Sequence, residues 1–138
     1  MPTLFTQIIN RDLPGHLVAE TADYVALLDR HPMTLGHTLV VPRKEVDYLF
    51  DLDETLLAGL MLFAKQVAAG LQKVVPCLRI GMAVVGLEVP HAHLHLVPLN
   101  DSYTIDFKKP KLRLSQEELA RLADELRGQW LCRSKIYL

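Results

Sequence analysis

The chain is poor in cysteine, in aromatic residues and in excess charge of either sign. Its 138 residues include two cysteines, Cys77 and Cys132, which lie far apart and outside any metal-ligand spacing. This usage argues against a disulfide scaffold and fits a reducing compartment. The formal net charge is -1. A dedicated nucleic-acid-binding protein is therefore not expected, because neutralising several phosphates needs a clear basic excess.

The sequence also gives little indication of a targeting segment or a membrane span. No basic cluster opens the chain, and the polar residues 10–12 interrupt the first apolar stretch, so we expect no signal peptide. The longest apolar region, Leu56 to Val75, contains Lys65, Gln66 and other polar residues in an amphipathic pattern. That pattern indicates a packed helix and not a membrane span. We therefore predict a cytoplasmic protein without membrane association.

Half of the residues are hydrophobic, which suits one domain over residues 1–138 with a sizeable core. The hydrophobic periodicity, caps and turn residues predict an α+β domain. Strands are predicted over residues 17–20, 24–28, 38–41, 80–85 and 92–97, with Pro98 ending the last. Helices are predicted over residues 4–10, from the Asp53 cap to about 75, and from a Ser-x-x-Glu capping box at 115–118 to about 127.

Three histidines alternate with apolar residues at His91, His93 and His95. With a rise of ~3.3 Å per residue, a strand would place all three imidazoles on one face. One neutral imidazole can attack phosphorus while a second stabilises the developing charge, and water then hydrolyses the intermediate. The same spacing also suits zinc ligands of a hydrolytic centre, or histidines hydrogen-bonded in a half-buried sheet. Spacing alone leaves these three interpretations open.

The residues around the histidines favour the first interpretation. Residues 88–98 resemble the signature of the histidine triad (HIT) superfamily, His-φ-His-φ-His-φ-φ with φ apolar. Residues 32–44 are similar to the family's Gly-His strand, and residues 4–14 to its N-terminal helix and turn. The resemblance covers residues from about 4 to about 99. It implies a five-stranded antiparallel sheet with a long helix packed on one face, and a short N-terminal and a C-terminal helix, the latter as an extension over about 115–130.

The resemblance also implies an activity. It indicates a nucleotide hydrolase or transferase acting at the α-phosphate of nucleoside phosphoramidates, dinucleoside polyphosphates or related conjugates. His93 matches the nucleophile that becomes nucleotidylated, and His95 and His37 match the residues that contact the α-phosphate. The carbonyl of His91 would accept the Nδ1 proton of His93 and leave Nε2 able to attack. The resemblance also implies homodimers in which two five-stranded sheets join into one, packed along the long helix.

A nucleotide-binding slot follows from the same resemblance. Asp29 matches the acid that hydrogen-bonds the ribose hydroxyls; taken alone, it is equally typical of a turn residue. The apolar positions that match the slot for the base are Leu4, Phe5, Ile8, Leu27 and Leu28. Taken alone, Leu4, Phe5 and Ile8 would be ordinary helix core.

Several positions depart from the family pattern. Thr3, Thr6 and Glu45 stand where many bacterial members carry two cysteines and a histidine that bind a structural zinc, so no metal cofactor is expected. In the loop before the triad, Leu87 and Glu88 replace residues that commonly contact the phosphate and leaving group. Glu88 would donate a proton to the leaving group if burial kept it protonated, or else cap the turn from outside. A nucleotide-sensing protein with little turnover and a histidine-ligated metal hydrolase are the alternative functions.

One basic run stands out against the balanced charge of the chain. It covers residues 108–113 and contains three lysines and an arginine. Such a run is able to touch a polyphosphate tail or RNA, but it is more typical of a solvated linker. The sequence therefore favours a linker for this segment.

Overall fold

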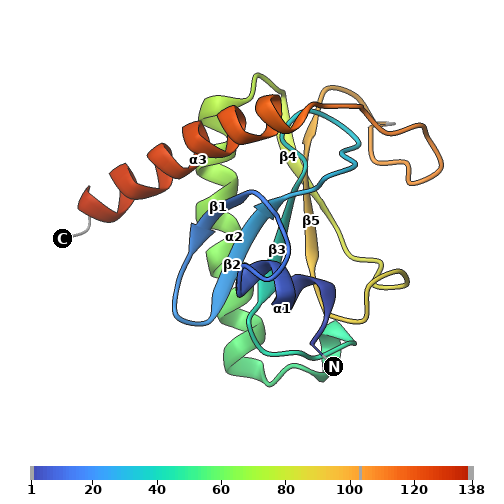
Figure 1. Cartoon of the computed structure of the whole chain (residues 1–138), viewed down its shortest axis with the longest axis vertical. Coiled ribbons are helices and arrows are strands. Elements are labelled where there is room, and N and C mark those ends of the chain that lie inside the picture. The colour runs from blue at the N-terminus through green and yellow to red at the C-terminus, as the bar shows by residue number, and fades with distance from the viewer. Residues whose placement is uncertain (1, 103, 137–138) are drawn as a thin grey trace.

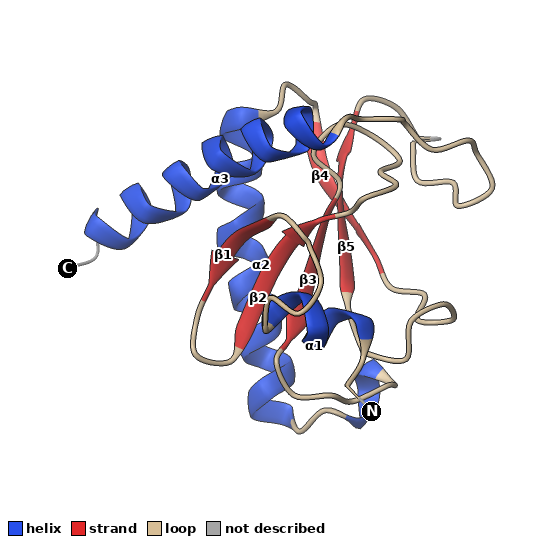
Figure 2. Ribbon diagram, viewed as in Figure 1, coloured by secondary structure: helices blue, strands red, loops and turns tan. Residues whose placement is uncertain are grey.

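The computed structural model describes residues 2–102 and 104–136, the last four of these by their backbone. Within these residues, five strands form one antiparallel sheet in the order β1-β2-β3-β5-β4, flanked by three α-helices (Figures 1 and 2). The strands are β1 (Leu17–Glu20), β2 (Tyr24–Leu28), β3 (Thr38–Pro42), β4 (Arg79–Ala83) and β5 (Leu94–Leu99). The helices are α1 (Leu4–Ile9), α2 (Glu54–Val74) and α3 (Gln116–Ile136), with a 3-10 turn at Leu49–Asp51. The predicted α+β fold is confirmed.

The sheet separates two apolar clusters, because successive side chains of a strand point to opposite faces. In β3, Val40 belongs to the core under α2, whereas Leu39 and Val41 pack with Phe5 and Ile8 of α1. Figure 1 shows α1 and α2 on opposite sides of the sheet. The core under α2 is the larger and also receives apolar side chains of α3. The face that carries α1 is covered by one short helix, which leaves room for a site.

Both long helices begin where their caps were predicted. The Asp53 carboxylate accepts a hydrogen bond from the Leu56 N–H at 2.9 Å. At the start of α3, the Ser115 hydroxyl accepts from the Glu118 N–H at 3.1 Å and donates to the Glu118 carboxylate at 3.2 Å. A cap of this kind contributes about 1 kcal/mol to helix stability. α3 continues to Ile136, beyond the predicted end near residue 127.

α2 is the one helix among the described residues that is long and apolar enough to cross a membrane by length and composition. Its buried side chains gather on one stripe that packs against the sheet. They are Leu60, Phe63, Ala64, Val67 and Leu71. Packing of this stripe accounts for the apolar composition of the helix.

Two strands differ from the predicted bounds. β4 ends at Ala83, two residues earlier than predicted, and β5 covers Leu94–Leu99 instead of 92–97. Pro98, predicted to end the strand, lies inside β5 and pairs with Ile80 of β4. The ladder between β3 and β5 stops at the pair of Thr38 and Leu96, so β5 has one unpaired side beyond that point. A proline without an N–H is tolerated at such a position.

Candidate active site

The three histidines of the motif lie on the face of the sheet that carries α1. In β5, Leu94 and Leu96 belong to the core under α2, and His95 is paired with Leu39, which packs on the α1 side. Directly paired residues of an antiparallel sheet share a face. The exposed fractions are 0% for His91, 6% for His93 and 8% for His95. The predicted alternation is confirmed, although His91 and His93 precede the strand.

Four rings form a row across this face. The ring centroids of Phe5 and His93 are 4.9 Å apart, those of His93 and His95 4.9 Å, and those of His95 and Phe107 5.1 Å. All three contacts are edge-to-face, the arrangement that aromatic quadrupoles favour. Phe5 comes from α1 and Phe107 from the connection between β5 and α3. His93 and His95 therefore lie between two aromatic rings, that of Phe5 at one end of the row and that of Phe107 at the other.

Hydrogen bonding fixes the tautomer of His93. Its Nδ1 lies 2.8 Å from the carbonyl oxygen of His91. A carbonyl oxygen only accepts, so Nδ1 carries the proton and donates it. In the neutral ring the lone pair is then on Nε2. His93 also lines a largely apolar pocket on this face, so it combines a nucleophilic nitrogen with access to a ligand.

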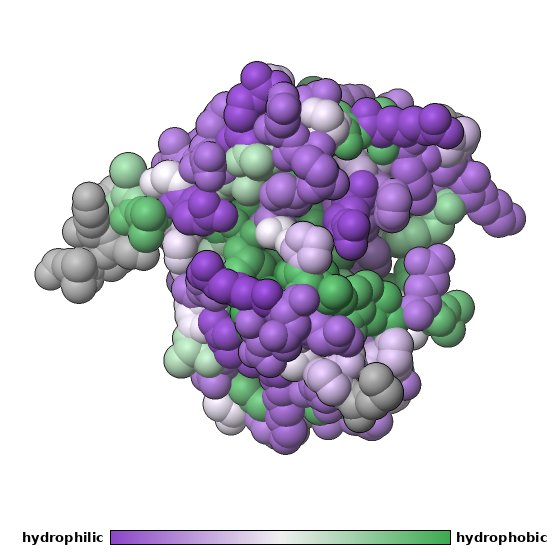
Figure 3. All heavy atoms as spheres, in the orientation of Figure 1, coloured by the Kyte–Doolittle hydropathy of each residue, from purple (hydrophilic) through white to green (hydrophobic). Residues whose placement is uncertain are grey.

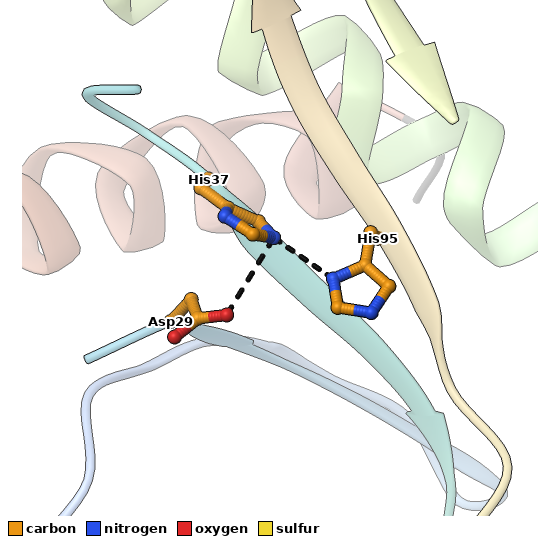
Figure 4. Close-up of side chains that lie close together, drawn as sticks. All are labelled: Asp29, His37 and His95. Atoms are coloured by element: carbon orange, nitrogen blue, oxygen red, sulfur yellow. Dashed lines mark hydrogen bonds and ion pairs between the residues drawn. The ribbon is translucent and has the colours of Figure 1, made fainter. Parts of the chain in front are cut away.

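A relay of hydrogen bonds fixes the tautomers of His37 and His95. The Met33 N–H donates to His37 Nδ1 at 3.0 Å, so the proton of neutral His37 is on Nε2. His37 Nε2 lies 2.9 Å from His95 Nδ1 and therefore donates to it (Figure 4). The proton of neutral His95 is consequently on Nε2, which points away from His37 in Figure 4. His95 thus presents an N–H donor without carrying a positive charge.

Burial keeps both rings of this relay neutral. Desolvation lowers the pKa of His37 to about 4, and electrostatic interactions with Lys111 and with His93 add to the effect. Burial likewise lowers the pKa of His95 to about 4, with His93 and His37 as further causes. Removing an imidazolium from water is costly, so the neutral form is favoured. Both rings are neutral near pH 7.

Asp29 lies beside the relay. Its Oδ2 is 3.6 Å from His37 Nε2, and its Oδ1 accepts a hydrogen bond from the His31 N–H at 2.9 Å. Asp29, His37 and His95 place three potential metal-ligand atoms within 4.8 Å of one another. They do not suit a metal ion, because His37 Nδ1 already faces the Met33 N–H and Nε2 must keep its proton. The arrangement is that of a hydrogen-bonded relay.

His91 is turned away from the relay. Its Nε2 donates to the Pro42 carbonyl at 2.7 Å, and its Nδ1 accepts from the hydroxyl of Thr3. The Thr3 N–H in turn donates to Glu45 Oε1 at 2.8 Å, and the Thr3 hydroxyl accepts from the Thr6 N–H at 3.2 Å. Both ring nitrogens of His91 are used, and hydroxyls are not the ligands that zinc prefers. Through these hydrogen bonds the N-cap of α1 contacts the segment that carries His91. The residues do not fit a structural zinc.

This position of His91 also bears on the metal hydrolase that the spacing left open. Three ligands from His91, His93 and His95 would have to converge on one ion. Hydrogen bonding instead commits His91 to Pro42 and Thr3, and commits His93 Nδ1 to the His91 carbonyl. The geometry therefore opposes a metal centre built from the three motif histidines.

A pocket of about 390 Å³ opens along the row of rings. Figure 3 shows this side of the molecule, with apolar surface across the middle between polar segments. Among the residues predicted for the site, those that line the pocket are Leu4, Phe5, Ile8, Leu27, Leu28, Asp29, Glu88, His93 and His95. Leu28 borders the pocket although its side chain belongs to the core under α2. His37 and His91 do not line the pocket themselves. His37 is hydrogen-bonded to the lining residue His95, and the His91 carbonyl accepts a hydrogen bond from the lining residue His93.

Two features of the pocket were left open or missed by the sequence analysis. Glu88 is exposed at the pocket rim, which is not the buried position that the role of proton donor to the leaving group supposed. Phe107 lines the pocket and was missed, because a single aromatic residue in a loop carries no periodic signal. Lys111, from the basic run assigned to a linker, lies 5.4 Å above the Phe107 ring. The connection between β5 and α3 is therefore part of the site.

Comparison with known proteins shows which family the chain is similar to. The family model described as HIT domain matches residues 10–102. The chain is 28% identical over 128 residues to the adenosine 5'-monophosphoramidase of Schizosaccharomyces pombe, covering 91% of this chain and 96% of that protein. It is 29% identical over 131 residues to an uncharacterised HIT-like protein of Borreliella burgdorferi, covering 89% and 94%.

A solved structure agrees with these matches. It is that of a hypothetical histidine triad nucleotide-binding protein from Sulfolobus tokodaii. The similarity has a TM-score of 0.79 and 30% sequence identity, and it covers 93% of this chain and 91% of that one. The match therefore extends over most of both chains.

Proposed function

The chain belongs to the HIT domain family, and from its site we propose that it hydrolyses nucleotide conjugates at the α-phosphate through a covalent intermediate on His93. The observation that carries the proposal is the fixed pair of tautomers: a lone pair on His93 Nε2 beside a neutral His95 that donates from Nε2. Relatives in Schizosaccharomyces pombe and Saccharomyces cerevisiae are named adenosine 5'-monophosphoramidases, which supports the same chemistry here. The conjugates are nucleoside phosphoramidates, dinucleoside polyphosphates or related molecules.

The reaction takes place in two displacements. His93 Nε2 donates its electron pair to the α-phosphorus, and the bond to the leaving group breaks with its electron pair going to that group, which takes up a proton from solvent. The His95 N–H stabilises the negative charge that gathers on the phosphate oxygens. A water molecule then attacks phosphorus and loses a proton to solvent, while the bond from phosphorus to Nε2 breaks. The products are a nucleoside monophosphate and regenerated His93.

The rest of the pocket binds the nucleoside. Phe5, Ile8 and Leu27 form an apolar cluster on the α1 side, a surface on which a planar base packs favourably. The Asp29 carboxylate is part-exposed at the end of β2 and accepts hydrogen bonds from ribose hydroxyls. Binding energy from these contacts holds the α-phosphate within reach of His93.

Intact-mass spectrometry tests the intermediate directly. We expect brief exposure of the protein to adenosine 5'-phosphoramidate, followed by rapid quenching, to add the mass of one adenylyl group. The adduct should map to the peptide that contains His93, and it should be absent after exposure to adenosine. Tight binding of AMP with no adduct and no turnover would contradict the hydrolase and indicate a nucleotide-sensing protein instead.

We also propose that two copies of the chain join through β4. This strand is one of the two edge strands of the sheet, and its backbone groups on the outer side are available to pair with a second strand. Met82, 40% exposed, shares a face with its β5 partner Leu96 and so lies on the α2 side of that edge. A symmetric pairing of edges would bury it.

Sedimentation equilibrium tests the dimer with a matched pair of variants. We expect the unmodified chain to sediment as a dimer and Met82→Lys to shift it toward monomer, since a buried unpaired ammonium is costly. Leu131→Lys, at a 54% exposed position of α3, is the control and should remain dimeric. A monomeric parent chain, or two variants that behave alike, would contradict pairing through β4.

A further inference from the structure

The connection between β5 and α3 crosses the phosphate end of the pocket. The Leu112 N–H donates to the Pro32 carbonyl at 2.9 Å and fixes this segment beside the loop that precedes His37. Phe107 reaches the pocket and places its ring 5.1 Å from that of His95. Its side chain remains 43% exposed, so part of the ring is available to a ligand. The segment therefore supplies a wall of the pocket next to His95.

Lys111 is positioned by the same segment. Its Nζ lies 5.4 Å above the Phe107 ring centroid and donates to the Phe107 carbonyl at 3.4 Å. Its positive charge is close enough to His37 and His95 to oppose protonation of both, and the negative charge of Asp29 acts on His95 in the opposite sense. Among the described residues, no carboxylate forms an ion pair with Lys111. The Lys111 ammonium is thus held against the Phe107 ring, which itself contacts the ring of His95.

The order of the rings shows which part of a substrate this ammonium would meet. The row runs from Phe5 through His93 and His95 to Phe107. The apolar cluster that suits the base lies at the Phe5 end. In the proposed complex the α-phosphate lies at His93 and His95, so Phe107, at the opposite end of the row from the base, is the ring available to a group beyond the phosphate.

We propose that Phe107 and Lys111 form a leaving-group subsite that selects substrates whose leaving group is anionic. The inference rests on the proposed function and deepens it. A further phosphate or a carboxylate on the leaving group offers oxygen acceptors to the Lys111 ammonium, a charge-assisted contact. Phe107 packs against the carbon atoms or rings of the group and keeps water from its side of His95. A neutral amide leaving group gives Lys111 no charge to bind.

Paired ligands separate this subsite from the rest of the pocket. Turnover is compared for adenosine 5'-phosphoramidates of aspartate, which is anionic, and of glycinamide, which is neutral. Calorimetry compares the affinities for ADP and AMP, which differ by one phosphate. We expect Lys111→Gln to lower the preference for the anionic member of each pair by about tenfold, the range measured for hydrogen bonds to charged groups. Lys111→Arg keeps the charge and should restore the preference.

Lys108→Gln is the matched control, because Lys108 is exposed in the same basic run. It should leave both preferences as in the parent chain. The subsite is overturned if Lys111→Gln changes neither preference, or if Lys108→Gln lowers them equally, which would indicate the diffuse charge of the run. If Lys111→Gln lowers the preference in only one of the two ligand pairs, the result supports the subsite and shows whether it accepts a carboxylate or a phosphate.

The two proposals fail in distinguishable ways. If neither conjugate is hydrolysed, the proposed hydrolase function is wrong, and the affinity ratio of ADP to AMP still decides the role of Lys111. If the chain binds neither ADP nor AMP, the leaving-group subsite is overturned together with the nucleotide pocket. If both conjugates are hydrolysed at rates that Lys111→Gln lowers equally, the hydrolase stands and the subsite is overturned.

Discussion

We expect replacement of His93 by alanine to reduce hydrolysis of adenosine 5'-phosphoramidate by about six orders of magnitude, the scale seen when a catalytic nucleophile is removed. The change removes Nε2, the nitrogen that would bond to phosphorus, while His95 and the nucleoside contacts stay. The loss should therefore appear in kcat, with the affinity for AMP changed far less. Release of AMP under saturating substrate measures the first quantity and calorimetry the second.

A second histidine provides the control for this substitution. His16 lies outside the pocket, where its Nε2 is hydrogen-bonded to Gln116 at 2.9 Å. His16→Ala should retain the turnover of the parent chain. Equal turnover by His93→Ala and the parent chain would reject the covalent mechanism. Loss of AMP binding in His93→Ala would show instead that the substitution had damaged the pocket.

The second large effect concerns stability at acid pH. Burial lowers the pKa of His37 and of His95 from 6.5 to about 4 in the folded chain. Between these values the unfolded chain binds more protons than the folded one, so stability is full above pH 6.5 and is lost as the pH falls toward 4. Together the two rings should lower the free energy of unfolding by roughly 3–5 kcal/mol between pH 7 and pH 4.5.

Urea denaturation at the two pH values measures this loss. The double variant His37→Asn/His95→Asn removes both titrating groups, so its stability should be lower at pH 7 but should fall much less on acidification. Carboxylates titrate in both proteins, and the difference between the two pH dependences isolates the histidine pair. His31→Asn, which alters an exposed histidine, should keep the pH dependence of the parent chain. Identical pH dependence in the double variant would contradict the assignment.

Much of the fold followed from local patterns in the sequence. The alternation of His91, His93 and His95 with apolar residues placed the rings on one face and Leu94 and Leu96 in the core, as the structure confirms. The caps of α2 and α3 were likewise predictable, because a side chain and an N–H three residues later suffice to make them. These features depend on residues close together in the chain.

The strand bounds were predicted less well. The last strand was predicted to end at Pro98. That proline lies within β5, because β3 is not paired with β5 at this position and needs no N–H from it. Whether a proline stops a strand depends on which neighbour needs its N–H, and the neighbour is set by the sheet order. This order joins residues that are distant in the sequence.

The sequence by itself determined the family, the sheet with its helices, and the histidines that carry the proposed chemistry. Hydrophobic periodicity and a motif of fixed spacing indicate all three, and both are local features of the chain. Only the tertiary structure decided the protonated nitrogens of His37 and His95 and the contribution of the connection between β5 and α3. His37 is hydrogen-bonded to His95 across 58 positions of the chain, and Phe107 reaches the pocket from a segment with no pattern. Such contacts arise when distant segments pack together, so no local rule of the chain predicts them.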